Sequence, residues 1–410
     1  MPRVPEGLAP LRHREFRLLF LGRLTSLAGT AIAPIALAFA VLDITGSATD
    51  LGLVLAAGMV PQIVFFLFGG VIADRLPRNR VMVGADLVSG VAQLGAAALV
   101  LSGDAAIWHL AALNALRGGA SAFFFPAAAG ITPQTVPGAE LQQTNALLRL
   151  TSSGTNIVGA AVGGVLVAAV GPGWALGWDG ITYLVGAVFI AAMRVRAAER
   201  VPGSGVLREL REGWSEFSSR TWLWAVVAAA ALGNMAFQIG YVVLGPVVAD
   251  RELGGPSAWG FIVAASAAGL LAGGLLAFRL RPRRPLRLAS SVLLLGSLGM
   301  IGLALGLPAW AIALGAFAGG MGLEVFGVFW DLSLQQHVPI EKLSRVSSYD
   351  ALGSFVVIPL GQVIAGPLSD AIGIEAAIWV AVILFVVPCA AILLVRDVRD
   401  LERTDTVPAA

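Results

Sequence analysis

Cysteine, lysine and charged side chains of every kind are scarce in this sequence. Cys389 is the single cysteine among 410 residues, which excludes an intramolecular disulfide. Lys342 is the single lysine. Charged residues make up 13% of the chain, against about 25% in a typical soluble protein, while 57% of the residues are hydrophobic. A soluble fold would have nowhere to place that apolar surface, so the composition predicts a polytopic membrane protein.

Sequence motifs of enzymes are missing as well. The chain has no Walker loop and no paired Cys/His spacing of the kind that binds a metal. Its three histidines, His13, His109 and His337, are scattered. The formal net charge of +2 is too small to suggest a nucleic-acid partner. We therefore expect no enzymatic activity, no cofactor, no metal site and no nucleic-acid binding.

Twelve apolar runs occupy most of the chain. Each is long enough to cross a hydrocarbon core, which takes about 20 helical residues. Helices are expected because the open edge of a sheet would leave backbone groups unpaired in lipid. The runs cover residues 18–42, 51–73, 81–101, 107–127, 146–170, 174–195, 222–248, 257–280, 286–306, 309–332, 347–371 and 375–394.

Basic residues fall in alternate connections between these runs. If every run spans the membrane, one side receives nearly all of them, and the opposite loops carry only Arg251. The positive-inside rule then places both termini in the cytoplasm. The residues on the basic side include Arg12, Arg14, Arg17, Arg75, Arg78, Arg80, Arg194, Arg220, Arg279, Arg281, Arg283, Arg284, Arg287, Lys342, Arg345, Arg396, Arg399 and Arg403.

The polar segment 196–221 divides the chain into two halves, 1–195 and 222–410. Within it, apolar residues at three- and four-residue spacing over 206–217 predict a short amphipathic helix lying on the membrane surface. The halves repeat weakly at an offset of 202 residues, as in Gly171 and Gly373. We therefore expect an N-terminal six-helix half, a cytoplasmic linker, and a C-terminal six-helix half with a short tail.

The connection after the second run has a distinctive order. Residues 70–80 read Gly-x-x-x-Asp-Arg-x-x-Arg-x-Arg, which resembles the loop between helices 2 and 3 of the major facilitator superfamily. Other segments resemble the bacterial multidrug, macrolide and siderophore exporters of that superfamily: residues 42–48, 122–127, 171–175, 335–339 and 345–347. The resemblance implies two pseudo-symmetric six-helix halves, alternating access, a monomer and a bacterial plasma (inner) membrane location.

Three motifs of the superfamily carry over. By resemblance, Asp74 latches the cytoplasmic side by contacting the start of helix 11, and Asp74, Arg75, Arg78 and Asp350 form a cytoplasmic gate. The helix 4 motif is Arg117-Gly118-Gly119. The antiporter motif of helix 5 lacks its proline at Ala160, but its small residues still allow close helix packing. The packing glycines are Gly159, Gly163 and Gly164.

Ionisable residues inside the apolar runs are candidates for function because each is costly in lipid. Arg23, Asp86 and Arg149 are shallow, so we expect structural pairing or snorkelling. Asp179 lies near the outer end of its run and is also expected to be structural. The deeper Glu324 is expected to titrate, its alternative being a buried, hydrogen-bonded acid. The proton-coupling candidates are Glu324, Arg117, Asp86 and Asp179.

Polar and aromatic side chains suggest a substrate cavity. Asn234 and Gln238 lie one helical turn apart and share a face. Pockets for bulky organic molecules are mostly apolar with a few polar groups. The predicted substrate-binding residues are Gln62, Asn234, Gln238, Tyr241, Phe326, Trp330 and Gln362.

The function expected from residues and resemblance together is secondary active export of bulky amphipathic compounds, such as a drug, antibiotic or siderophore. Proton antiport is the expected driving reaction, so the expected partners are a small-molecule substrate, protons and the lipid bilayer. One alternative is an importer or facilitator of a small metabolite. An alternative of another class is a membrane sensor or scaffold that does not transport.

Overall fold

The computed structural model describes residues 6–195 and 214–404, apart from the side chains of residues 6–8, 67–75, 340–341 and 344–345. Within that range, 11 helices are long and apolar enough to cross a membrane. A twelfth helix, α5 (Ile107–Ile131), has a similar length of 25 residues but carries Asn114 and Arg117 among its apolar residues. The chain is an all-α membrane protein with twelve transmembrane helices in two six-helix halves.

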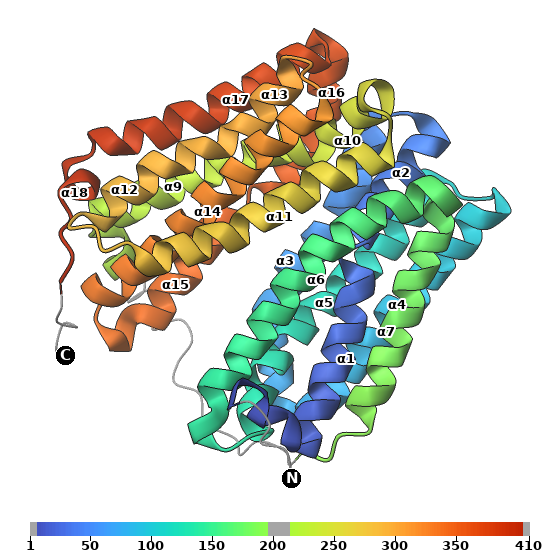
Figure 1. Cartoon of the computed structure of the whole chain (residues 1–410), viewed down its shortest axis with the longest axis horizontal. Helices are drawn as coiled ribbons and strands as arrows, with labels where there is room; N and C mark the ends of the chain where they lie inside the picture. Colours follow the sequence, from blue (N-terminus) through green and yellow to red (C-terminus); the bar gives the residue numbers. More distant parts are fainter. Residues whose placement is uncertain (1–5, 196–213, 405–410) are drawn as a thin grey trace. The chain divides into compact units, whose positions relative to one another are not determined.

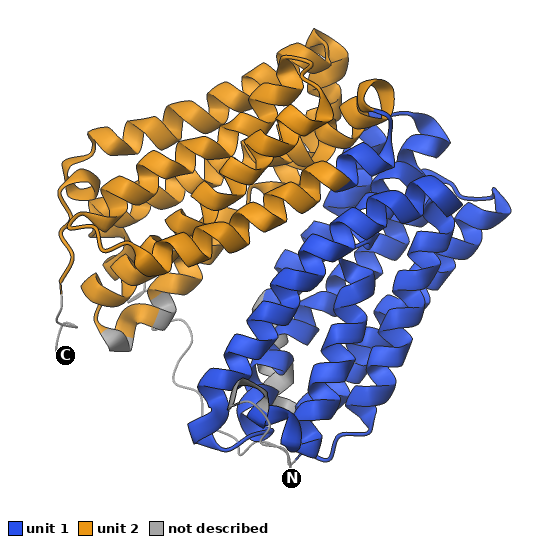
Figure 2. Cartoon of the chain, in the orientation of Figure 1, with its two compact units in different colours: residues 1–201, 254–260 blue, residues 202–253, 261–410 orange. Residues whose placement is uncertain are grey.

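The chain divides into two compact units, shown in Figure 2. Unit 1 comprises Met1–Val201 and Gly254–Gly260. Its α-helices, labelled in Figure 1, are α1 (Arg14–Thr30), α2 (Ala33–Thr45), α3 (Ala48–Arg75), α4 (Arg78–Ser102), α5, α6 (Leu141–Val170) and α7 (Pro172–Ala191). Its 3-10 helices are η1 (Glu6–Arg12), η2 (Thr132–Gln134) and η3 (Gly138–Glu140).

Unit 2 comprises Pro202–Leu253 and Phe261–Ala410. Its elements are α9 (Thr221–Phe237), η4 (Gln238–Val243), α10 (Leu244–Val248), η5 (Ala249–Leu253), α11 (Pro256–Arg279, with its first turn in unit 1), α12 (Pro285–Leu293), η6 (Leu294–Ser297), α13 (Leu298–Ala304), α14 (Ala309–His337), α15 (Ile340–Phe355), α16 (Ile358–Ile372), α17 (Ile374–Ala391), η7 (Ile392–Leu394) and α18 (Arg396–Arg399).

Several apolar runs that read as single helices are interrupted. The run 18–42 splits into α1 and α2, and Pro34 lies in the first turn of α2. Proline has no N–H to donate to the preceding turn, so it starts a helix more readily than it continues one. The run 222–248 contains the π-helical segment η4, and the run 286–306 contains the 3-10 segment η6. Proline and irregular turns thus break helices whose composition alone is uniformly apolar.

Glycines allow close helix contacts inside unit 1. α3 packs against α5, and α4 packs against both α5 and α7. A Cβ atom on Gly118 would overlap the carbonyl group of Gly58, so α3 and α5 approach to backbone contact there. This contact fixes the position of Arg117, the residue before Gly118. In unit 2, α12 and α13 pack against α14, and α9 packs against α17.

The glycines of the antiporter-like motif lie on packing faces of α6. A Cβ atom on Gly159 would overlap the Ala31 side chain, and one on Gly163 would crowd Ile32, both at the break between α1 and α2. Gly164 faces Gly260 in the first turn of α11, which also belongs to unit 1. Close packing at these three positions therefore occurs without the proline of the superfamily motif.

The weak repeat at an offset of 202 residues corresponds to repeated backbone geometry. Gly171 has φ +86° and ψ 162° directly before α7, and Gly373 has φ +87° and ψ 154° directly before α17. Residues other than glycine rarely adopt this positive φ. The sixth helix of each half therefore begins with the same glycine-dependent turn.

The predicted linker falls mostly outside the described residues. Residues 196–213 are not described, so the surface helix predicted over 206–217 stays a prediction. Residues 214–218 are helical and precede α9. In this part, Glu216 accepts hydrogen bonds from Arg220 and Lys342, which joins the segment to the start of α15.

Candidate functional site

Two buried carboxyl groups lie inside unit 1. Asp86 on α4 is 1% exposed, and Asp179 on α7 is fully buried. The two helices pack against each other, and the charge of Asp179 acts on Asp86 through space. Gln93, two turns along α4 from Asp86, donates a hydrogen bond of 2.5 Å to Oδ2 of Asp179. This hydrogen bond from α4 therefore fixes the position of the Asp179 carboxyl group.

Several oxygen atoms in this region have no hydrogen-bond partner among the residues that the structure describes. They are Oδ2 of Asp86, Oδ1 of Asp179 and Oγ of Ser26 on α1. Glycines provide the space around them: a Cβ atom on Gly186 would overlap Ser26 Oγ, and one on Gly29 would overlap Asp179 Oδ1. An ionised carboxylate in a buried site without a cation is strongly unfavourable. The arrangement therefore suits carboxyl groups that carry a proton.

A tyrosine and a threonine lie between the two acids. Tyr183 follows Asp179 by one turn of α7, and its hydroxyl group is hydrogen-bonded to Thr30 of α1 at 3.0 Å. Tyr183 is within electrostatic range of both Asp86 and Asp179. Thr30 lies one turn from Ser26 on the same face of α1. Acids and hydroxyl groups thus form a continuous buried polar region along α1, α4 and α7, which we call the unit 1 polar ladder.

Arg117 borders this ladder from α5. Its Nε and Nη2 atoms donate to Oδ1 of Asn114 at 3.2 and 3.0 Å. Asn114 in turn donates to the carbonyl oxygen of Val54 on α3 at 2.8 Å. The guanidinium acts on Asp179 through space but forms no ion pair with any residue that the structure describes. A cation held in this way favours negative charge on Asp179 without neutralising it by contact.

Glu324 has different surroundings. It is half-buried on α14 in unit 2, beside Gly273 and Gly274 of α11. Its side chain makes no hydrogen bond or ion pair within the described residues. The alternative expectation for it, a buried and hydrogen-bonded acid, is therefore not what the structure contains.

The predicted polar residues of the substrate cavity are distributed over both units. Within unit 2, Asn234 donates to the carbonyl oxygen of Ser354 at 2.9 Å. Gln362 donates to Oε1 of Gln238 at 3.0 Å, which links α16 to η4. Gln62 lies half-buried on α3 in unit 1. A joint cavity formed by all four residues stays a prediction.

The predicted aromatic residues pack inside unit 2. Phe237 and Tyr241 stack with their ring centroids 4.7 Å apart. Together with Asn234 they line a cavity of about 70 Å³, too small for a drug-sized molecule. Phe326 and Trp330 of α14 stack at 6.2 Å. Tyr241, Phe326 and Trp330 are all buried, so within unit 2 they support helix packing.

The predicted gate residues are only partly described. The side chains of Asp74 and Arg75 lie outside the described set, so their role stays a prediction. Arg78 donates from Nη1 to the carbonyl oxygen of Gly130, which ties the start of α4 to the end of α5. Asp350 accepts a hydrogen bond of 2.9 Å from Trp330, which ties α15 to α14. Both contacts stay within one unit.

The partners of the two buried acids were not predicted from the sequence. Asp86 and Gln93 on α4 are seven residues apart, and Asp179 and Tyr183 on α7 are four apart, so each pair shares a helix face. Polar residues at this spacing in an apolar helix are the signal that identifies such a region. Among the described residues, no group of three or more His, Cys, Asp or Glu side chains is placed to hold a metal ion.

Comparison with known proteins gives a consistent result. The Major Facilitator Superfamily profile matches residues 19–349. Macrolide efflux protein A of Streptococcus pyogenes is 24% identical over 396 residues, which cover 95% of this chain and 97% of that protein. The multidrug efflux pump Tap of Mycobacterium tuberculosis is 27% identical over 415 residues, covering 97% and 96%.

A solved structure supports the same assignment for the fold. A point mutant of the nucleoside transporter NupG superposes with a TM-score of 0.77 at 12% identity, covering 93% of this chain and 99% of that one. At this identity the likeness concerns the fold alone. The profile match spans well over half of the residues, and the chain therefore belongs to the Major Facilitator Superfamily.

Proposed function

We propose that the protein is a secondary exporter that moves bulky amphipathic organic compounds out of the cell in exchange for protons. Two similar relatives carry the names of a macrolide efflux protein and a multidrug efflux pump. The Major Facilitator Superfamily consists of transporters and not of enzymes. The proposal adds the direction, the substrate class and the driving ion to the family assignment.

The observation that carries the proposal is the pair of buried acids in unit 1. Asp86 and Asp179 each have an oxygen atom without a hydrogen-bond partner, and neither forms an ion pair within the described residues. Moving a charged carboxylate into the membrane interior costs at least ~2.5 kcal/mol on insertion scales. Such groups are stable when protonated and release the proton when water enters. This is the chemistry required of a proton carrier.

Coupling then follows from alternating exposure of these acids. A proton taken up from outside and released to the cytoplasm moves one charge through the membrane potential, which is worth about 2.3 kcal/mol per 100 mV. Because tenfold in concentration corresponds to about 1.4 kcal/mol, that energy supports a substrate gradient of about 40-fold. The unit 1 polar ladder supplies the proton-carrying groups, and Arg117 favours the ionised state. Glu324 is the third candidate acid.

The proposed substrate path combines residues of both units. We assign Gln62, Asn234, Gln238, Tyr241, Phe326, Trp330 and Gln362 to its walls, and Asp74, Arg75, Arg78 and Asp350 to its cytoplasmic gate. The amide groups would orient polar atoms of the compound, and the aromatic rings would contact its apolar part.

We also propose that both termini face the cytoplasm of a bacterial plasma membrane. The charge pattern of the connections supports this orientation. In a Cys389→Ala background, Ser102→Cys at the end of α4 should react with an impermeant maleimide in whole cells. Ser219→Cys, before α9, should react only after the cells are opened. The reverse labelling pattern would contradict the orientation.

Accumulation in inside-out membrane vesicles tests the exporter proposal. Vesicles from a host that lacks its own efflux pumps should take up ethidium or erythromycin when energised. A protonophore, which collapses both the pH gradient and the membrane potential, should release the accumulated compound. Uptake confined to right-side-out vesicles would instead support an importer of a small metabolite. Absence of movement in either orientation, for a broad panel of compounds, would support a sensor or scaffold that does not transport.

A further inference from the structure

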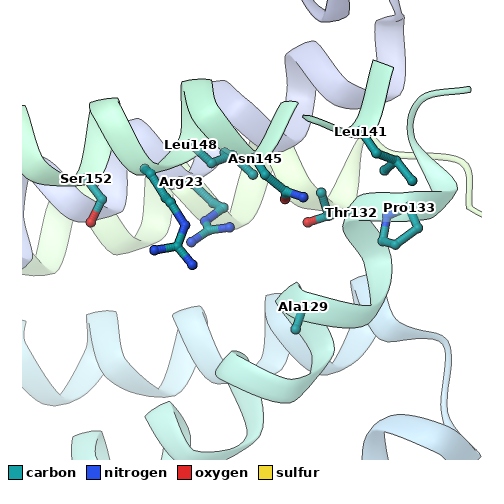
Figure 3. Close-up of a pocket in the computed structure, with 9 residues that line it drawn as sticks. Arg23, Ala129, Thr132, Pro133, Leu141, Asn145, Leu148 and Ser152 are labelled. Carbon is teal, nitrogen blue, oxygen red and sulfur yellow. The ribbon is translucent and has the colours of Figure 1, made fainter. Parts of the chain in front are cut away.

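A second polar region of unit 1 is separate from the polar ladder. It is a cavity of about 550 Å³ between α1, the end of α5 and the start of α6. Figure 3 shows side chains from α1 and α6 directed at this hollow, with Ala129 of α5 on its opposite side. The volume lies within the range of about 300–1,000 Å³ that is usual for pockets binding small organic molecules.

The pocket contains two arginines and no acid. Arg23 of α1 and Arg149 of α6 both line it. Neither guanidinium makes a hydrogen bond or ion pair within the described residues, so the structural pairing expected from the sequence does not occur there. Two acids near this end of unit 1 are engaged elsewhere: Glu140 bonds His13 at 3.1 Å, and Glu15 bonds Arg14 at 2.7 Å.

The two charges are permanent and one of them is partly buried. Arginine keeps its proton at every physiological pH. Arg23 is half-buried, so its charge is partly removed from water without a counter-ion among the residues that the structure describes. A bound anion would offset that desolvation, and guanidinium groups bind planar carboxylates and phosphates through two parallel hydrogen bonds. Asn145 and Ser152 add uncharged hydrogen-bonding groups on the same wall.

The rest of the lining, apart from Thr132, is apolar. Leu141, Leu148 and Pro133 border the pocket beside the arginines. An occupant that satisfies both kinds of surface needs an acidic group joined to an apolar body. We propose that this pocket binds the carboxylate or phosphate group of an amphipathic organic anion that the transporter exports. This inference rests on the proposed export function and adds compounds with an acidic group to its substrates.

A matched pair of fluorescent probes tests the proposal without any transport step. Pyrenebutyrate and its neutral amide share the same ring and differ in charge. Fluorescence anisotropy with purified protein in a neutral detergent should show the acid binding about tenfold or more tightly than the amide. Combining Arg23→Gln with Arg149→Gln should abolish that preference and leave binding of the amide unchanged.

Two further variants act as controls. Arg17→Gln removes an exposed arginine from the same helix outside the pocket and should keep the full preference for the acid. Arg149→Lys retains the positive charge and should keep most of that preference. Equal affinity of the wild-type protein for acid and amide would overturn the proposal. So would a preference that persists in the double variant, with folding checked by its thermal unfolding curve.

A lipid headgroup is the other source of the same anionic chemistry. Transfer of the protein into nanodiscs of phosphatidylcholine should leave pyrenebutyrate binding intact, and phosphatidylglycerol nanodiscs should give the same affinity. Loss of binding in phosphatidylglycerol alone would show that lipid occupies the site and would overturn the assignment to a transported compound. Export of the cation ethidium by the double variant tests the export function separately from the anion pocket. If this variant exports ethidium, the export function is supported whether or not the pocket binds pyrenebutyrate.

Discussion

Gln93 of α4 donates a 2.5 Å hydrogen bond to the carboxyl group of Asp179 on α7, with both side chains buried inside unit 1. The bond fixes one oxygen of Asp179 and leaves the other, Oδ1, without a partner. One half of the carboxyl group is therefore anchored, and the other half remains available to hold a proton. The hydrogen bond that joins α4 to α7 thus also determines which oxygen of Asp179 carries the proton in the proposed coupling reaction.

Replacement of Gln93 by methionine tests the anchoring role. The side chain keeps a similar length but loses its amide, so Asp179 Oδ2 becomes a second unpartnered buried oxygen. Leaving a buried polar group unsatisfied costs about 1–3 kcal/mol. We expect Gln93→Met to lower the midpoint of thermal unfolding in detergent. Gln134→Met, at an exposed position in η2, is the matched control, and an equal midpoint for the two variants would contradict the role of the bond.

By resemblance to the superfamily, Asp74 is expected to hold the cytoplasmic side closed through a contact with the start of the eleventh apolar run, residues 347–371. A carboxylate near a helix N-terminus is favourable by up to about 1 kcal/mol, which corresponds to a population change of about fivefold. Asp74→Asn should therefore lower export sharply while membrane insertion remains normal. Asp104→Asn, in the exposed loop after α4, should export like the wild type. Near-normal export by well-expressed Asp74→Asn protein would refute the latch.

Outside the membrane, a charge cluster joins the segment before α9 to α15. Glu216 accepts hydrogen bonds from Lys342 at 2.7 Å and from Arg220 at 3.0 Å. The hydrogen bond from Lys342, with further contributions from Arg220, holds the pKa of Glu216 below its usual range. The ionised carboxylate is thus the form that binds these cations.

The lowered pKa predicts a pH dependence of stability. A carboxyl group whose pKa falls on folding contributes stability above its unfolded pKa of about 4.3 and loses that contribution as the pH drops through the folded value. The thermal midpoint of Glu216→Gln should be lower than that of the wild type at pH 7. The difference should disappear at about pH 3. A difference that is constant from pH 7 to pH 3 would contradict an ionic origin.

Much of the fold could be predicted from the sequence because lipid imposes strict requirements on length and polarity. The twelve apolar runs followed from that pattern. The family and the packing glycines on α6 were instead expected from the resemblance of short motifs, such as residues 70–80, to the superfamily. The break between α1 and α2 did not, because the apolar composition continues through Pro34. The interruption depends on one missing N–H group, which hydropathy does not register.

Contacts between polar residues were harder to predict. Asp179 was expected to be structural from its depth and was also a proton-coupling candidate, and its hydrogen bond from Gln93 was not foreseen. Arg23 and Arg149 were expected either to pair or to snorkel, and no pairing partner occurs within the described residues. Which side chains meet depends on how each helix is rotated about its axis. That rotation is determined by close contacts such as Gly58 with Gly118, which a single sequence does not specify.

Proton movement driven by a substrate gradient tests the central claim most directly. Proteoliposomes containing a dye for internal pH would receive ethidium on one side, with no imposed pH gradient. Wild-type protein should move protons opposite to the ethidium, and the variant combining Asp86→Asn with Asp179→Asn should move ethidium downhill with no proton flux. Asp104→Asn should behave like the wild type. Undiminished proton flux in the double variant would contradict coupling through Asp86 and Asp179. That conclusion would hold whether or not Glu324→Gln abolishes the flux.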